Sequence, residues 1–473
     1  MIRKRPDSAK DRDKRKTAPP RSLVGEVEPL ALGASGLVVG VGKKRFAIAA
    51  AAPGDHVRIR PRPLPPEARR AVMSGELPLA ERLAVETPGP QRVLAPCSLL
   101  SRCGGCALQE LAYPAQVTGK EQALKALLLG LEVETKVVEA TVVHPLSRPY
   151  GYRTKLTMSA GGKAGSLRFG FYARGNFEPL GAEGCPVQHP LTLATLAQVR
   201  QVLDGFRVAP SLREERDGWL HGMAIRVEPE NTSAELTLVG RDAVLPRGEA
   251  LTKALGALPL LESVYLSVNP KRSSYLLGDE FLHLAGGRRM RFSMGGQKLS
   301  LSPGSFLQTC HEGGERLVER VLALLPERIE TLVDLYGGVG IFARASAERW
   351  QRATVVESSP YAIADLQRAI QRKQAPKLDV VEGRVEENLD AVLKPSPEVV
   401  IVDPPRRGCH SKVINALCKA RPSVLVYVAC GADSFTRDAK MLMAKGYTLD
   451  HVEGVDMFPH TTHLEIVARF RDA

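Results

Sequence analysis

The sequence has no apolar run of about 20 residues, the length needed to cross a lipid bilayer. No apolar segment follows the basic residues 1–22, so these residues do not form a secretory signal. Aromatic residues make up only 5% of the chain. Without a secretory signal, the eight cysteines are expected to be reduced rather than paired in disulfides. These absences predict a cytoplasmic protein that does not associate with membranes.

The chain is long and basic. Its 473 residues exceed what one compact core can hold, so two or three domains are expected. Residues 1–22 hold nine Lys/Arg and three Asp, which places about +6 of the net charge of +13 there and leaves +7 for the rest. The tail alone is consistent with a role in solubility and equally with a flexible arm that binds a polyanion. A basic remainder favours nucleic acid as the partner.

Changes in sequence pattern predict a multidomain fold. After a basic tail at 1–21, residues 22–75 alternate short β-rich runs with turn residues, which predicts a small OB-like β-barrel. A proline-rich linker at 61–70 follows. Residues 90–300 contain a helical pattern and then many short β-like runs, which indicate a central α+β domain. From 301 to 473, apolar strands alternate with helical stretches, as in a parallel, Rossmann-like α/β sheet.

The segment "LVDLYGGVG" predicts a cofactor loop at the end of a strand. Asp334 ends the apolar run, and Gly338 and Gly340 lie in the turn before a helix. Glu357 ends the next strand, where a carboxylate can bind ribose hydroxyls. The loop has neither the complete G-x-G-x-x-G pattern nor G-K-[ST], so S-adenosylmethionine (SAM) fits better than NAD or ATP. A tight turn without a ligand is the alternative.

Three further polar residues stand at strand ends. Asp403 ends the run "EVVIV" and is followed by two prolines, which present it at the carboxyl edge of the sheet. Cys430 ends the next strand, "SVLVYVA". Glu465 begins a last apolar run. By itself, a cysteine at such a position is most often an inert core thiol.

In their order along the chain, these segments resemble the RNA 5-methyluridine (uracil-C5) methyltransferases. The resemblance is carried by "DLYGGVGIF", "VVES", "IVDPPRRG", "YVAC" and "DMFPHTTHLE", and by "LSPGSFLQT" at 301–309. It covers nearly the whole chain except the tail. It implies that residues 22–75 form a TRAM domain, that 301–473 form a SAM-dependent methyltransferase domain, and that RNA is the substrate.

The resemblance also assigns roles to single residues. It makes Cys430 the nucleophile and Glu465 the general base, while Asp403 contacts the cofactor and the target base. Uracil C5 is too weak a nucleophile to take a methyl group directly, and thiolate attack at C6 converts the ring to an enolate that reacts at C5. A base must then remove the C5 proton. The expected cofactor contacts are Gln308, Tyr336, Gly338, Gly340, Glu357 and Asp403.

Some residues depart from the family pattern or keep two interpretations. Gly431 stands where Asn usually follows the nucleophile, Ile341 stands in place of a common Asn, and Arg384 stands where a polar residue lies beside the adenine. His460 and His463 flank the base and either tune it or form a structural turn. No motif includes the remaining cysteines, which are expected to be core thiols: Cys310, Cys409 and Cys418.

Four cysteines predict a metal site. Cys97, Cys103 and Cys106 have the spacing C-x5-C-x2-C, and Cys185 stands far along the chain. Four thiolates select zinc or an iron–sulfur cluster, and spacing does not separate the two. The resemblance favours a 4Fe-4S cluster over zinc. Its expected role is to brace the central domain rather than to take part in methyl transfer.

The RNA partner is expected to contact basic residues between tyrosines. Arg148, Arg153 and Lys155 have this setting, which suits backbone contacts with stacking, although a solvated strand face explains them equally well. We expect a monomer that acts on rRNA rather than tRNA, because the barrel and cysteines resemble the rRNA-acting branch. The alternatives are a tRNA enzyme and a catalytically vestigial RNA-binding or ribosome-assembly protein.

Overall fold

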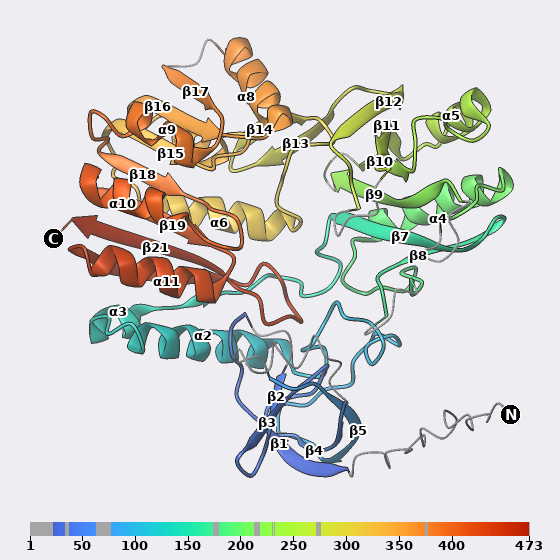
Figure 1. The fold of residues 1–473 in the computed structure, drawn as a ribbon, viewed down its shortest axis with the longest axis horizontal. Helices are drawn as coiled ribbons and strands as arrows, with labels where there is room; N and C mark the ends of the chain where they lie inside the picture. The colour runs from blue at the N-terminus through green and yellow to red at the C-terminus, as the bar shows by residue number, and fades with distance from the viewer. Residues whose placement is uncertain are drawn as a thin grey trace, which may run out of the picture.

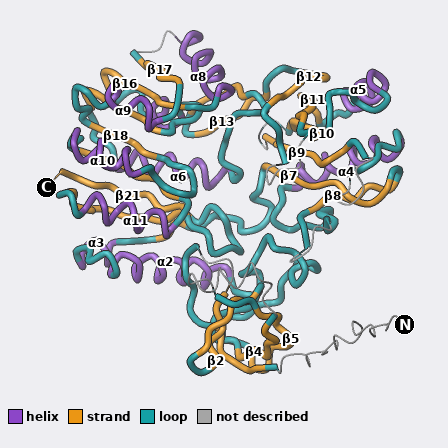
Figure 2. Tube along the Cα trace, viewed as in Figure 1, coloured by secondary structure: helices purple, strands orange, loops and turns teal. Residues whose placement is uncertain are grey.

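The computed structural model describes residues 22–33, 37–62, 77–173, 179–211, 218–228, 230, 232–270, 276–373 and 377–472. The expected tail at 1–21 and most of the expected linker at 61–70 lie outside these residues. Three sheet-containing parts surround a middle region in which loops predominate (Figure 2). No helix among the described residues has the length and apolar character needed to span a membrane.

The N-terminal part is a five-stranded antiparallel sheet with the order β3-β2-β1-β4-β5. Its strands are β1 (Leu23–Val27), β2 (Leu37–Val41), β3 (Lys44–Ile48), β4 (His56–Pro61) and β5 (Ala80–Thr87). The two edges meet through a bridge between Ala47 and Leu79. In β4, Arg58 and Arg60 are exposed and alternate with buried residues, so the expected basic face is present. Because β5 pairs with β4, the sheet extends beyond the expected limit at residue 75.

The next segment packs against the C-terminal part. It contains α2 (Tyr113–Leu129), α3 (Thr135–Ala140) and β6 (Val143–His144). The expected helix is confirmed, and it begins near Pro114, which suits a first helical turn. Leu124 and Leu128 are fully buried in a core shared with the C-terminal sheet. Strand β6 pairs with β20 at the edge of that sheet, although it precedes the central sheet in sequence.

The central part is a six-stranded sheet with the order β12-β11-β10-β9-β7-β8. Its strands are β7 (Lys155–Lys163), β8 (Ser166–Gly170), β9 (Leu220–Glu228), β10 (Ser233–Gly240), β11 (Leu261–Val268) and β12 (Glu280–Gly286). Helices α4 (Pro190–Gly205) and α5 (Gly248–Gly256) pack on it around one apolar core. Only β10 and β11 pair in parallel, so the expected antiparallel α+β character is confirmed.

The C-terminal part is built on an eight-stranded sheet with the order β17-β16-β15-β18-β19-β21-β20-β6. The further strands are β15 (Ile329–Leu335), β16 (Trp350–Glu357), β17 (Leu378–Glu382), β18 (Val399–Val402), β19 (Val424–Ala429), β20 (Tyr447–Val455) and β21 (Glu465–Asp472). Among them β21 alone runs antiparallel to its neighbours. The strand order reverses beside β15, which is where open α/β sheets form a ligand crevice.

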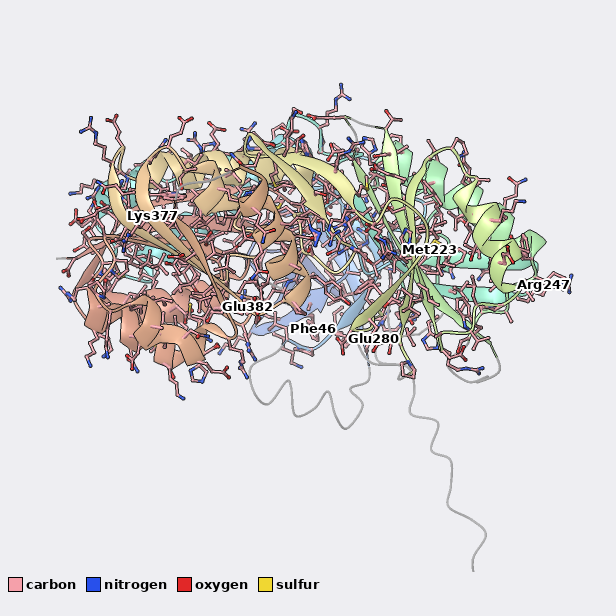
Figure 3. All side chains as sticks on the ribbon, turned by 90° about the horizontal axis from the view of Figure 1, so that it is seen from above. Phe46, Met223, Arg247, Glu280, Lys377 and Glu382 are labelled. Carbon is pink, nitrogen blue, oxygen red and sulfur yellow. The ribbon has the colours of Figure 1, made fainter. Side chains whose placement is uncertain are left out.

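Helices cover both faces of this sheet (Figure 1). One face packs on α6 (His311–Leu324), α7 (Ile341–Ala345) and α8 (Pro360–Lys373), and the other on α9 (Val385–Val392), α10 (Ser411–Ala420) and α11 (Ala432–Met443). The hairpin β13 (Met290–Met294) and β14 (Gln297–Leu301) connects the central sheet to this part. Seen from above, Lys377 of the C-terminal part and Arg247 of the central part lie at opposite ends of the molecule (Figure 3).

Candidate active site

Four of the expected cofactor residues line one cavity at the strand-order reversal. Gln308, Tyr336, Gly338 and Asp403 share a cavity with an empty volume of about 500 Å³, part of it open to solvent. They come from the segment before α6, from the loop after β15 and from the end of β18. The cavity therefore brings together residues that are separated by almost a hundred positions in the sequence.

The loop after β15 holds a backbone conformation that favours a ligand. Tyr336, Gly338 and Gly340 have positive φ angles of 61°, 57° and 71°. For a tyrosine this conformation costs of the order of 1–3 kcal/mol, and such strain concentrates at binding sites. A Cβ atom at Gly338 would point into open space, with no atom within 4 Å. The loop thus leaves room for a ligand next to its backbone.

Two carboxylates support this loop. Glu357 Oε2 accepts a hydrogen bond from the Gly338 amide at 2.9 Å, and its Oε1 accepts from the Ser359 amide at 2.6 Å. Asp334 is fully buried, and its Oδ1 has no hydrogen-bond partner among the described residues. Burial, followed by repulsion from Asp403 and Glu357, raises the pKa of Asp334 to about 8. The sequence identified Glu357 as a site residue but gave Asp334 no role.

The expected reactive residues meet at one edge of the C-terminal sheet. Asp403 follows β18, and Cys430 follows β19, which is parallel to β18. Strand β21 runs antiparallel to β19 with Ile466 opposite Ala429. The next pair in this register is Cys430 opposite Glu465. The topology therefore places the thiol, the base and the aspartate beside one another.

Burial raises the pKa values of Cys430, Glu465 and Asp403. Burial, followed by repulsion from Glu465 and Asp403, raises the pKa of Cys430 to about 11. Burial, followed by repulsion from Asp403, raises the pKa of Glu465 to about 8. Burial alone raises the pKa of Asp403 to about 7. Such elevated values in a cleft are typical of catalytic sites.

Two features of the site favour the thiolate. The positive charge of Arg406 lowers the pKa of both Cys430 and Glu465, against the effects above. Helix α11 begins at Ala432, so its positive N-terminal end lies next to Cys430. A Cβ atom at Gly431 would lie 3.1 Å from Arg406 O, so the departure from the family pattern suits the local packing.

Helix α2 holds the loop that leads to Glu465. Lys120 Nζ donates to Asp456 Oδ1 at 2.6 Å, to Phe458 O at 3.2 Å and to His463 O at 2.9 Å. Gln116 Oε1 accepts from the His460 amide at 2.8 Å. His460 is buried, its φ is 66°, and burial lowers its pKa to about 4. These contacts match the structural-turn interpretation of His460. Sequence reasoning missed Lys120 and Gln116.

The tyrosines near the expected RNA-binding residues have structural contacts. The Tyr150 ring stacks on His460 at 4.2 Å between centroids, and the Tyr152 hydroxyl donates to Pro459 O at 3.1 Å. Arg148 is exposed, whereas burial lowers the pKa of Lys155 to about 8. Lys155 lines a small cavity that also contains Gln308. Lys155 is only partly exposed, and both tyrosines hold the loop before Glu465.

The four cysteines of the expected metal site affect one another's ionisation. Burial, followed by repulsion from Cys185, Cys103 and Cys97, raises the pKa of Cys106 to about 12. Repulsion from Cys97 and Cys103 likewise adds to the effect of burial on the pKa of Cys185. Thiolates are the ligands that zinc and iron–sulfur clusters prefer. Within the described ranges, no three potential ligands lie close enough to hold a single metal ion.

Two other residues that differ from the family pattern, Ile341 and Arg384, lie in or near the cofactor loop. Ile341 lines the cofactor cavity, and Arg384 is exposed next to Glu386, at 3.7 Å. Glu386 accepts a hydrogen bond from the Tyr336 hydroxyl at 3.4 Å, so Arg384 connects to the cofactor loop through it. Cys310 and Cys409 are buried, as expected of core thiols, and Cys418 is partly buried against the same core.

Comparisons with known proteins agree with this geometry. The tRNA (uracil-5-)-methyltransferase family matches residues 291–469. An uncharacterised RNA methyltransferase of Listeria innocua is 31% identical, with 81% of this chain and 85% of that protein covered. One from Synechocystis is 30% identical, with 88% of each covered. The structure of the Pyrococcus abyssi tRNA (uracil-54, C5)-methyltransferase with S-adenosyl-L-homocysteine has the same fold, with a TM-score of 0.72, 24% identity and coverage of 94% and 100%.

Proposed function

Because the chain belongs to the RNA uracil-C5 methyltransferase family and is therefore a SAM-dependent RNA methyltransferase, we propose that it forms 5-methyluridine in rRNA through a covalent bond between Cys430 and uracil C6. The observation that carries this proposal is the meeting of Cys430, Glu465 and Asp403 beside the cavity that Asp403 shares with Gln308 and Tyr336.

Cys430 starts the reaction. Its thiolate attacks C6 of the flipped uracil, an Sγ–C6 bond forms, and the electron pair of the C5–C6 double bond moves to give an enolate. C5 then takes the methyl group. Glu465 removes the proton that C5 still carries, the double bond reforms, and Sγ leaves C6 with the electron pair of the broken bond. Both Cys430 and Glu465 must reach the same base, as their positions next to the paired residues Ala429 and Ile466 allow.

Residues around the cavity hold the cofactor. When bound, SAM supplies the methyl group as an electrophile. The open space beside Gly338 and the turn at Gly340 admit it next to the backbone, and Glu357 and Gln308 offer polar contacts. Tyr336 and Asp403 orient it between the glycine loop and the reactive edge.

The four cysteines are assigned to a 4Fe-4S cluster rather than to zinc. Cys97, Cys103, Cys106 and Cys185 influence one another's ionisation, and the family resemblance favours a cluster over zinc. A 4Fe-4S cluster would bind each thiolate at a different iron. Held by these cysteines, a cluster would brace the loop that follows Cys106, whose Ala107 and Leu108 amides donate to His460 O.

The division of the chain into domains is also part of this proposal. We assign the N-terminal sheet to an OB-like TRAM domain that contacts RNA, and we keep 90–300 and 301–473 as the central and methyltransferase domains. The joining of edges at Ala47 and Leu79 supports a closed barrel. Arg58 and Arg60 face outward, although Glu86 and Glu81 neutralise part of their charge. We expect the protein to act as a monomer in the cytoplasm.

A tRNA substrate is the second candidate. The matched family and the Pyrococcus abyssi protein are both described as tRNA enzymes, and the latter covers this chain from the N-terminal sheet to the C-terminal sheet. The N-terminal sheet therefore does not favour rRNA over tRNA by itself.

Methyl transfer from labelled SAM to unmodified rRNA and tRNA tests both candidates, with nucleosides identified by mass spectrometry. The proposal predicts 5-methyluridine in rRNA with the wild-type chain and none with Cys430→Ala. Product in tRNA alone would establish the second candidate. SAM binding without product in either RNA would indicate the vestigial, RNA-binding alternative.

A further inference from the structure

A second hollow adjoins the cofactor cavity but is distinct from it. It lies between the hairpin β13–β14 and the helices α7 and α8, and its empty volume is about 1290 Å³, part of it open to solvent. Val339 is the one residue that lines both spaces. A ligand in the second hollow would therefore touch the cofactor loop without occupying the cofactor cavity.

The lining of this hollow is strongly basic. Its charged residues from the hairpin and the two helices are Arg291, Lys298, Arg344 and Arg368. The one carboxylate in the lining is Asp365, and its oxygens are already used. Oδ1 accepts from Arg289 at 2.8 Å, and Oδ2 accepts from the Ser302 amide at 2.6 Å and the Ser305 hydroxyl at 2.7 Å. The four cations thus have little compensation from within the hollow.

Two of the guanidinium groups have no carboxylate partner among the described residues. Arg344 is only 8% exposed, and its Nη2 donates to the Lys298 carbonyl at 3.1 Å. Arg368 is partly exposed, but its Nε atom is buried and has no hydrogen-bond partner within the described part of the chain. Neither side chain takes part in an ion pair with another described residue. Burial of an uncompensated guanidinium is costly, so an anion in the hollow would stabilise both.

We propose that this hollow binds a backbone phosphate of the RNA substrate. Planar guanidinium groups on two helices match the oxygens of a phosphate, which they can bind in a bidentate manner. RNA offers a phosphate at every nucleotide, and the inference rests on the proposed RNA substrate. Because Val339 separates the two spaces, a phosphate there would anchor the RNA while SAM is bound.

Binding of a labelled, unmodified rRNA fragment to the full chain over a range of salt concentrations tests the proposal. Arg368→Gln should weaken binding roughly tenfold and reduce the slope of log K against log salt by about 1. Arg368→Lys keeps the charge but not the bidentate geometry, so it should keep the salt slope of the wild-type chain and lose part of the affinity. Arg352→Gln removes an exposed arginine of β16 that lies outside both spaces, and it should bind as the wild-type chain does.

Arg344→Gln provides a second variant, since glutamine keeps a donor for the Lys298 carbonyl. Wild-type affinity and salt slope in both glutamine variants, with melting temperatures showing that they are folded, would overturn the proposal. Inorganic phosphate provides a further test, through its effect on the melting temperatures of the wild-type chain and of Arg368→Gln. If phosphate stabilises only the wild-type chain, and Arg368→Gln still binds RNA as the wild-type chain does, the hollow binds free phosphate and the RNA assignment is overturned. Methyl transfer by the wild-type chain is measured on the same RNA. If the wild-type chain transfers no methyl group to this RNA, the proposed function is wrong. If it does, but the glutamine variants bind the RNA as the wild-type chain does, only the proposed phosphate site is wrong.

Discussion

Lys120 Nζ lies 2.6 Å from Asp456 Oδ1, and both side chains are fully buried although they stand 336 positions apart. The same ammonium group also donates to the carbonyls of Phe458 and His463. Glu465 follows His463 by two residues. The lysine therefore ties helix α2 to both ends of the loop that delivers the proposed base.

Replacing Lys120 by methionine should destabilise the fold strongly. Removal of one partner leaves Asp456 buried without its counter-ion, and such a change costs about 3–5 kcal/mol. Lys125→Met is the matched control, because Lys125 belongs to the same helix and forms a partly exposed pair with Glu121. Its loss should cost under about 1 kcal/mol. Urea unfolding measures both values, and equal stability of the two variants would contradict the role of Lys120.

The pH dependence of methyl transfer should follow both reactive groups. The nucleophile acts as a thiolate and the base as a carboxylate, and their pKa values are raised to about 11 and about 8, so kcat/KM should still rise with pH above pH 8. Arg406→Gln should move this rise to higher pH, because Arg406 lowers the pKa of Glu465 and Cys430.

Arg407→Gln is the control for this experiment, since it removes a neighbouring arginine whose charge is not among the main causes of either pKa shift. Its pH profile should coincide with that of the wild-type chain. A profile for Arg406→Gln that also coincides with the wild type would show that Arg406 does not act on the base.

Acid should weaken the contact between α6, β6 and β20. Burial raises the pKa of Glu453, but hydrogen bonds from His451 and His144 lower it more, to about 2 from an ordinary value of 4.5. A lowered pKa gives stability that is complete above pH 4.5 and is lost as the pH falls toward 2. Glu453→Gln should therefore be less stable than the wild type at pH 6 and should approach it near pH 2 in thermal unfolding. A constant difference across this range would exclude the linkage.

The strand pattern predicted much of the active site. "DLYGG", "IVDPP" and "YVAC" each place a polar residue after an apolar run, and parallel strands bring such ends to one edge. Asp403 and Cys430 could therefore be placed together before the structure was available. Glu465 was predicted to lie with them only from the family resemblance. The antiparallel register of β21 gives the physical reason for its position.

The supporting contacts could not be predicted in this way. Lys120 lies within an ordinary helical pattern, and lysine is almost never fully buried, so nothing in the local sequence distinguishes it. The pairing of β6 with β20 depends on two residues that are far from β20 in sequence. Tyr150 and Tyr152 stood among basic residues, which suited RNA stacking and a solvated strand face equally, whereas their actual contacts are with His460 and Pro459 of a distant loop.

The covalent bond between Cys430 and RNA is the central claim, and Glu465→Gln tests it most directly. Glutamine cannot take the C5 proton, so the methylated adduct should persist after incubation with SAM and unmodified RNA. The account predicts a protein–RNA species that survives denaturation, with the mass of one methylated nucleotide mapped to the peptide containing Cys430. Methylated RNA without any retained protein, or an adduct on a peptide that lacks Cys430, would contradict it.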